Sequence, residues 1–296
     1  MTDREIQGVW IGLSGYILWG LSPIFWKALN QVEAMDIVSW RVICTFIFVA
    51  TCNTLLRLTK RGKVDHLSFL RNKLSVLGGG LIGLNWGIFV WAVESERVVE
   101  ASLGYFMNPL MNVFLGVVFL GEALRKAQWL AVTFAATGVL WLTVSLNAFP
   151  WVSLTLAISF ALYGLIRKVA VASPLQGLRV ETSVLLIPAV AFVLFRGNAS
   201  ENLTGDSATT ILILLSGAVT GIPLLLFASS AKRIPLSILG ILQYITPTIQ
   251  FLLGVFAYNE TFDSNRLIGY SIIWSGLVIF ALDSFRFASS QDTHEK

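Results

Sequence analysis

Charged residues are scarce in this sequence. Asp, Glu, Lys and Arg together make up 13% of the 296 residues, whereas a soluble globular domain contains about 25%. Six long runs contain none of these four residue types, namely 6–26, 74–93, 101–121, 127–166, 207–231 and 234–259. A membrane-spanning helix needs about 20 mostly apolar residues, and 55% of this chain is hydrophobic. We therefore expect an all-α, polytopic membrane protein.

Residues that bind metals or act as nucleophiles are also few. The two cysteines, Cys44 and Cys52, lie in one apolar segment, and the two histidines are His66, in a basic loop, and His294, in the tail. No HExxH or CxxC motif occurs, so we expect no disulfide framework, no metal site and no cofactor. An intramembrane enzyme is disfavoured because the apolar segments contain no histidine and no Ser–Lys or Asp–Asp pair at helical spacing. No GxxxxGK[ST] motif occurs, which argues against direct use of ATP.

The apolar runs and the charges between them predict ten transmembrane helices. We expect them at about 7–28, 36–57, 74–93, 99–121, 127–145, 150–168, 177–195, 209–230, 235–258 and 264–284. Cytoplasmic loops carry an excess of Lys and Arg, which orients such a chain. With both termini cytoplasmic, fifteen basic residues fall on the inside and four on the outside. This bias explains the net charge of +4 without a nucleic-acid partner.

The two halves of the chain share a pattern of polar and helix-breaking residues. The stretch GYFMNPLMNVFLGVVFLGE (104–122) has a counterpart 138 residues later, LQYITPTIQFLLGVFAYNE (242–260). Its matched pairs include Asn108 with Thr246, Pro109 with Pro247, and Asn112 with Gln250. The halves, 1–145 and 146–296, hold five predicted helices each. Because five is odd, the second half enters the membrane with the opposite orientation, which predicts inverted repeats with a substrate site near the midplane.

Five segments carry a resemblance to a known family. They are WGLSPIFWK (19–27), NWGIFVWAVE (85–94), EASLGYFMNPLMNVFLGVVFLGE (100–122), ALYGLIRK (161–168) and LQYITPT (242–248). With these segments the sequence resembles RarD-type transporters of the EamA family, in the drug/metabolite transporter superfamily, over nearly its whole length. The resemblance implies two five-helix halves and a multi-pass permease of the inner membrane. It implies transport more firmly than any particular cargo.

Polar residues inside the predicted helices are candidates for substrate binding. Asn108 and Asn112 are four residues apart and share a helix face, as Thr246 and Gln250 do in the second half. These faces either line a central cavity or bind neighbouring helices through hydrogen bonds. Asn85 beside Trp86 fits a ring-shaped or amphipathic ligand, or else helix packing. The full candidate set is Asn85, Trp86, Tyr105, Asn108, Asn112, Tyr163, Gln243, Tyr244, Thr246 and Gln250.

Prolines and charges within the helices are candidates for coupling or gating. The set is Trp19, Pro23, Arg41, Pro109, Glu181 and Pro247. Pro23 marks either a gate or a static kink. Arg41 is near enough to a helix end to snorkel to the membrane surface. Glu181 either carries a proton during transport or forms an ion pair with Arg167 or Lys168.

These features together predict a secondary active transporter, not an enzyme. It would move a small organic metabolite or drug-like solute across the inner membrane by alternating access. The alternative is a lipid scramblase or flippase, which would have a polar groove open to lipid. The expected partners are a small-molecule substrate and the lipid bilayer. The apolar helices 127–145 and 264–284 are either peripheral supports or contacts of a homodimer.

Overall fold

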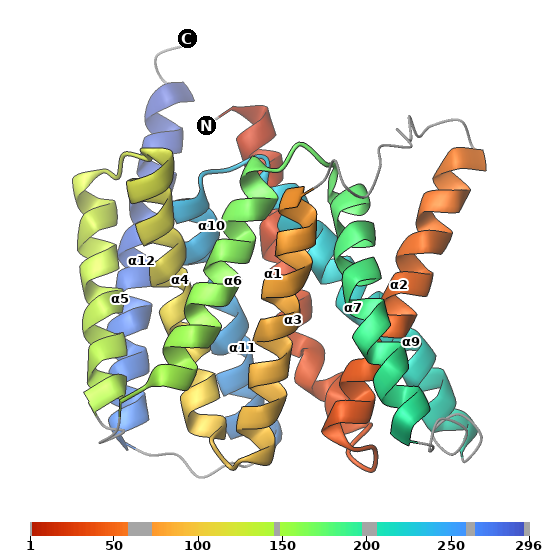
Figure 1. Ribbon diagram of the computed structural model, residues 1–296. Coiled ribbons are helices and arrows are strands. Elements are labelled where there is room, and N and C mark those ends of the chain that lie inside the picture. Colours follow the sequence, from red (N-terminus) through yellow and green to blue (C-terminus); the bar gives the residue numbers. More distant parts are fainter. Residues whose placement is uncertain (1, 59–72, 145–148, 197–205, 259–263, 293–296) are drawn as a thin grey trace.

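The computed structural model describes residues 2–58, 73–144, 149–196, 206–258 and 264–292, which form a bundle of helices (Figure 1). The helices are α1 (Asp3–Lys27), α2 (Ala34–Leu58), α3 (Lys73–Glu94), α4 (Val98–Leu120), α5 (Lys126–Val144), α6 (Trp151–Val169), α7 (Pro174–Arg196), α9 (Ser207–Ala231), α10 (Leu236–Gln243), α11 (Ile245–Leu252), the π-helix η2 (Leu253–Ala257) and α12 (Ser264–Asp292). No strand occurs in these ranges, so the all-α prediction is confirmed for this part of the chain.

Most of the helices are long and apolar enough to cross a membrane. Within the described residues nine stretches meet this condition, the last being Leu236–Ala257, which combines α10, α11 and η2. The apolar part of α12 is shorter and covers Leu267–Asp283. These stretches make the chain a multi-pass membrane protein. The tenth span and the inverted relation of the two halves remain predictions.

Both ends of the chain lie at the same end of the bundle (Figure 1). We call this the terminal end and the opposite one the distal end. The charged residues that follow or precede helices at the terminal end are mostly basic, namely Arg125, Lys126, Arg167, Lys168, Lys232 and Arg233. This distribution fits a cytoplasmic terminal end, and the orientation in the membrane remains a prediction.

The expected helix 235–258 is interrupted near its middle. Helix α10 ends at Gln243, Tyr244 forms a turn, and α11 begins at Ile245. Pro247 has no amide hydrogen and cannot donate to the carbonyl of Gln243, four residues earlier. A Cβ at Gly240 would lie 2.7 Å from the carbonyl oxygen of Pro109, so α10 and α4 approach closely just before the break. Discontinuous helices of this kind are typical of transporters at their binding sites.

Helices α5 and α12 form a closely packed pair at one edge of the bundle (Figure 1). A Cβ at Gly138 would lie 2.7 Å from the carbonyl oxygen of Gly269, and one at Gly276 equally close to that of Ala131. Small residues on both sides therefore bring the two backbones together, as in many membrane helix pairs. Their peripheral position is as expected, and the homodimer remains a prediction.

Candidate functional site

A cavity of about 870 Å³ lies in the distal half of the bundle. On α1 its lining runs from Trp19 to Trp26, near the distal end of that helix, and on α2 from Ala34 to Arg41. Val98, in the first turn of α4, places the cavity mouth at the distal end. Pockets for drug-sized ligands have volumes of about 300–1,000 Å³. The cavity is therefore large enough for a small organic solute.

Most of the residues singled out in the sequence contribute to this cavity. Those that line it are Trp19, Pro23, Arg41, Asn85, Trp86, Tyr105, Asn108, Gln243, Thr246, Pro247 and Gln250. Five others do not line it, namely Pro109, Asn112, Tyr163, Tyr244 and Glu181. The roles assigned to all of them remain predictions.

Asn112 lies behind the cavity wall. It is fully buried, and its amide nitrogen donates to the side-chain oxygens of Gln243, at 3.0 Å, and Asn108, at 3.3 Å. Both acceptors line the cavity, one from α10 and one from α4. Asn112 therefore orients two amide groups of the wall and connects the two halves of the chain. The expectation that its own side chain faces the cavity is not what the structure shows.

Asn85 takes part in helix packing and also lines the cavity, the two interpretations that the sequence left open. Its amide nitrogen donates to the carbonyl oxygen of Leu156 and to the hydroxyl of Ser159, both at 2.9 Å. These bonds join α3 to α6. The same residue lines the cavity, so helix packing holds it in the wall.

Pro23 lies within a helix that continues through it. Proline cannot donate to the carbonyl of Trp19, four residues earlier. That carbonyl instead accepts from the hydroxyl of Ser22 at 2.8 Å and from the amide of Gln250 at 3.4 Å. The carbonyl of Trp19 thus connects α1 to α11 through Gln250. Both donors, Ser22 and Gln250, line the cavity.

A cluster of five aromatic side chains underlies the cavity on the side of the terminal end, and we call this layer the floor. This aromatic cluster consists of Tyr16, Trp19, Phe160, Tyr163 and Phe227, whose neighbouring ring centroids are 5.4–6.3 Å apart. Trp19 and Phe160 also line the cavity. Aromatic pairs at such separations attract each other beyond the burial of their surface. The cluster, drawn from α1, α6 and α9, separates the cavity from the terminal end.

Polar contacts hold the terminal end together beyond this floor. The carboxylate of Glu122, which follows α4, accepts from the backbone amides of Leu236 and Ser237 at 2.6 and 2.8 Å. These amides begin α10, where the helix dipole favours a negative charge. The ammonium of Lys168 donates to the carbonyl of Ile234 at 2.6 Å. The contacts of Glu122 connect the first half of the chain to the second.

Glu181 forms a buried ion pair. Its carboxylate accepts from the guanidinium of Arg167 and from the hydroxyl of Tyr163, each at 2.9 Å. The exposed fractions of the Arg167 and Glu181 side chains are 0% and 1%. Arg167 also donates to the carbonyl of Pro174. Of the two interpretations of Glu181, the structure contains the ion pair.

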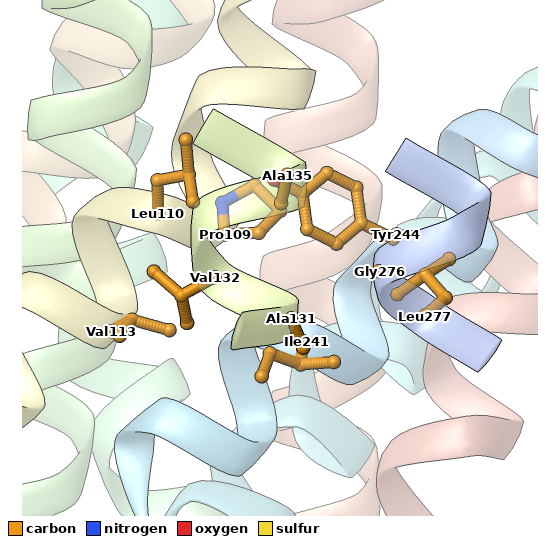
Figure 2. A pocket seen from close by; sticks show the side chains of 10 residues that line it. All are labelled: Pro109, Leu110, Val113, Ala131, Val132, Ala135, Ile241, Tyr244, Gly276 and Leu277. Carbon is orange, nitrogen blue, oxygen red and sulfur yellow. The ribbon is translucent and has the colours of Figure 1, made fainter. Parts of the chain in front are cut away.

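A second, much smaller void lies between α4, α5, α10 and α12. Figure 2 shows its lining, which includes Pro109 and Tyr244. Its volume is about 10 Å³, no more than the space that one water molecule needs. Both residues therefore contribute to helix packing here.

The sequence interpretation missed several lining residues. Many are aliphatic, and the aromatic and hydroxyl residues among them include Phe89, Phe160, Thr220, Phe251, Tyr258 and Tyr270. Phe89 lies four residues after Asn85 and thus on the same helix face, a signal that was available. Thr220 is one of several Ser and Thr residues of α9, and no signal in the sequence singled it out.

Comparisons with known proteins agree with this architecture. The EamA-like transporter family matches residues 6–144 and 150–282. "Protein RarD" of Streptomyces exfoliatus is 41% identical, covering 97% of this chain and 91% of that protein. "Uncharacterized transporter YojE" of Bacillus subtilis (strain 168) is 40% identical, covering 97% and 98%.

A more distant relative and a solved structure extend the comparison. "Chloramphenicol-sensitive protein RarD" of Pseudomonas aeruginosa is 30% identical over 96% of this chain and 97% of that protein. One crystal structure superposes with a TM-score of 0.68 at 21% identity, covering 93% of this chain and 98% of the other, and at this identity it shows the fold alone. The chain therefore belongs to the EamA-like transporter family as a RarD-type membrane transporter.

Proposed function

We propose that this protein is a secondary active transporter that moves a small organic metabolite or drug-like solute by alternating access. One observation carries the proposal, namely the asymmetry of the bundle. The distal half contains a cavity of about 870 Å³, and the terminal half is closed by the aromatic cluster and by the contacts of Glu122 and Lys168. Such an arrangement corresponds to one of the two end states of an alternating-access cycle.

The cavity wall draws on both halves of the chain. Asn108 comes from the first half, and Gln243, Thr246 and Gln250 come from the second. A substrate bound between them would contact both halves at once. In the proposed cycle the aromatic floor opens, Glu122 releases the start of α10, and the distal mouth closes. With cytoplasmic termini, the present conformation would be open to the outside of an inner membrane.

Transport in reconstituted liposomes tests the proposal. Purified protein is expected to move at least one radiolabelled solute from a panel of small metabolites and drug-like compounds down an imposed ion gradient, without ATP. Asn108→Ala is expected to reduce that flux. Asn53→Ala is the matched control, because Asn53 is a buried asparagine of α2 that does not line the cavity. Equal flux in a well-folded Asn108→Ala protein would contradict the substrate-binding role.

Access to the cavity can be followed separately. Ser102 is exposed and lines the cavity, so a Ser102→Cys protein in a Cys44→Ser, Cys52→Ser background offers one accessible thiol. A membrane-impermeant maleimide is expected to label it from the distal side, and substrate under a gradient is expected to slow this labelling. Unchanged labelling throughout turnover would argue against alternating access. Rapid movement of fluorescent phospholipids between leaflets, without solute flux, would instead support the scramblase alternative.

A further inference from the structure

Arg41 is the one charged residue among the described residues that line the large cavity. It lies on α2, about two turns from the start of that helix, and faces aromatic and amide groups. Ionisable side chains in membrane helices are costly and usually pair with one another or mark a substrate path. The question is which negative charge compensates this cation.

No acidic residue of the described chain does so. Three carboxylates near the distal end have other partners among the described side chains, since Glu33 and Asp36 bind Arg196, and Glu100 binds Arg97. The Nε atom of Arg41 is buried and has no hydrogen-bond partner among the described residues.

Two aromatic rings hold the guanidinium group of Arg41 in position. Its central carbon lies 4.1 Å from the ring centroid of Trp86 and 5.4 Å from that of Trp26. A stacked guanidinium uses its face for the aromatic contact and retains the N–H donors at its edge for a planar, two-oxygen acceptor. The hydroxyl of Thr220 is a second buried group in the wall without a partner. The cavity therefore has unused donors of a kind that recognises an anion.

We infer that the cargo is a small organic monoanion, a carboxylate on an aromatic or apolar body, and that Arg41 binds its carboxylate. The inference rests on the proposed transport function and specifies the class of substrate. The remaining wall fits such a body, because Trp19, Trp86 and Tyr105 offer flat apolar surfaces. A second cation, Lys27, lies over the ring of Tyr258 at 3.5 Å, at the distal rim, where it would attract anions.

Because Arg41 is the one charged residue in the described lining, a substrate with one negative charge fits the cavity better than a substrate with two. A dianionic phosphate would leave one charge uncompensated in a wall that otherwise offers apolar and neutral polar groups, and an unpaired buried charge is costly. A carboxylate matches the two edge donors of one guanidinium. A lipid phosphate also carries one charge, so the experiment includes lipid as a competitor.

Binding measurements on matched ligand pairs test the inference. Purified full-length protein in neutral detergent is titrated with phenylacetate, 4-phenylbutyrate and indole-3-acetate, and with the corresponding carboxamides, by isothermal titration calorimetry. A hydrogen-bonded charge pair predicts that at least one carboxylate binds about 10-fold to 100-fold more tightly than its amide. Arg41→Gln is expected to weaken carboxylate binding much more than amide binding and so to abolish this preference, and Arg41→Lys is expected to restore part of it.

Arg179→Gln is the matched control, because Arg179 is also a helix-embedded arginine but lies outside the cavity wall. It is expected to keep the preference, and thermal unfolding of each variant shows that it is folded. The inference is overturned if no pair shows a preference that depends on Arg41. It is also overturned if phosphatidylglycerol binds in a manner that depends on Arg41 whereas the soluble carboxylates do not bind.

The same proteins separate this inference from the transport proposal. An Arg41-dependent carboxylate preference without flux in liposomes would support the anion site and refute transport. Flux of neutral solutes that is equal in wild type and Arg41→Gln, with no preference for carboxylates, would support transport and overturn the anion site.

Discussion

The buried ion pair of Arg167 and Glu181 yields a sharp prediction about stability. Glu181→Gln keeps the shape of the side chain but removes the charge that compensates Arg167. The guanidinium is fully buried, and its exposed fraction is 0%. The guanidinium also donates to the neutral backbone carbonyl of Pro174. Breaking such a pair from one side costs about 3–5 kcal/mol, because it leaves an uncompensated buried charge. We expect a loss of that size in the free energy of unfolding.

A double-mutant cycle checks the reasoning. The cycle compares Arg167→Met, Glu181→Leu and the two combined. The double variant removes both charges, so we expect it to lose less stability than either of these single variants, whose losses would otherwise add. The assay is reversible unfolding in mixed micelles, followed by circular dichroism. Losses below about 1 kcal/mol in the single variants, or strict additivity in the double variant, would refute the claim that the pair is buried and mutually dependent.

The Glu181→Gln variant also distinguishes a structural ion pair from a proton-carrying role of Glu181. If the carboxylate only holds α6 against α7, Glu181→Gln lowers stability and leaves the pH profile of flux unchanged in shape. If the carboxylate carries a proton, the variant loses the pH dependence or the coupling to a proton gradient. Flux measured from pH 5.5 to 8.5 in liposomes, with folded protein verified beforehand, distinguishes these outcomes. The ion pair leads us to expect the first.

Three further predictions follow from local geometry. Gly177→Ala is expected to destabilise the protein severely, because a Cβ there would overlap the buried guanidinium described above, whereas Gly80→Ala, which meets nothing within 4 Å, is the neutral control in the same unfolding assay. Glu122→Gln is expected to cost about 1–3 kcal/mol, because it removes the charge that accepts hydrogen bonds at the start of α10, and a loss below about 0.5 kcal/mol would contradict this. Asp206 accepts from the backbone amide of Thr209, which lowers the pKa of its carboxyl group. Its contribution is present above the ordinary Asp pKa of about 3.9 and lost as the pH falls through the lowered folded-state pKa. The melting temperatures of wild type and Asp206→Ala should therefore differ at pH 7 and converge in strong acid, and a constant difference would contradict the cap.

Much of the architecture follows from local sequence. The charge-free runs predicted the spanning helices, because apolar length and the lack of charge are properties of a segment by itself. The predicted bounds lie close to those of the structure, and the largest difference is at α12, which continues to Asp292 beyond the expected end at 284. Spacing of four residues put Asn108 and Asn112 on one helix face, and of these two Asn108 lines the cavity. The break at Tyr244 was not predicted, because Pro247 alone marks a weak point without showing how the chain turns there.

The partners of the polar side chains depended on tertiary structure. Asn112 shares a helix face with Asn108, yet it donates to Gln243 behind the wall, since α10 packs against that turn of α4. Glu181 had two possible partners in the sequence, and the approach of α7 to α6 selects Arg167. From the sequence, Arg41 was interpreted as a residue whose side chain could extend to the membrane surface. Its contact with Trp86, and its place in a cavity whose described lining contains no acidic residue, depend on how α2 and α3 face each other. Apolar length is encoded segment by segment, whereas the partner of a buried polar group is decided by which helix faces meet.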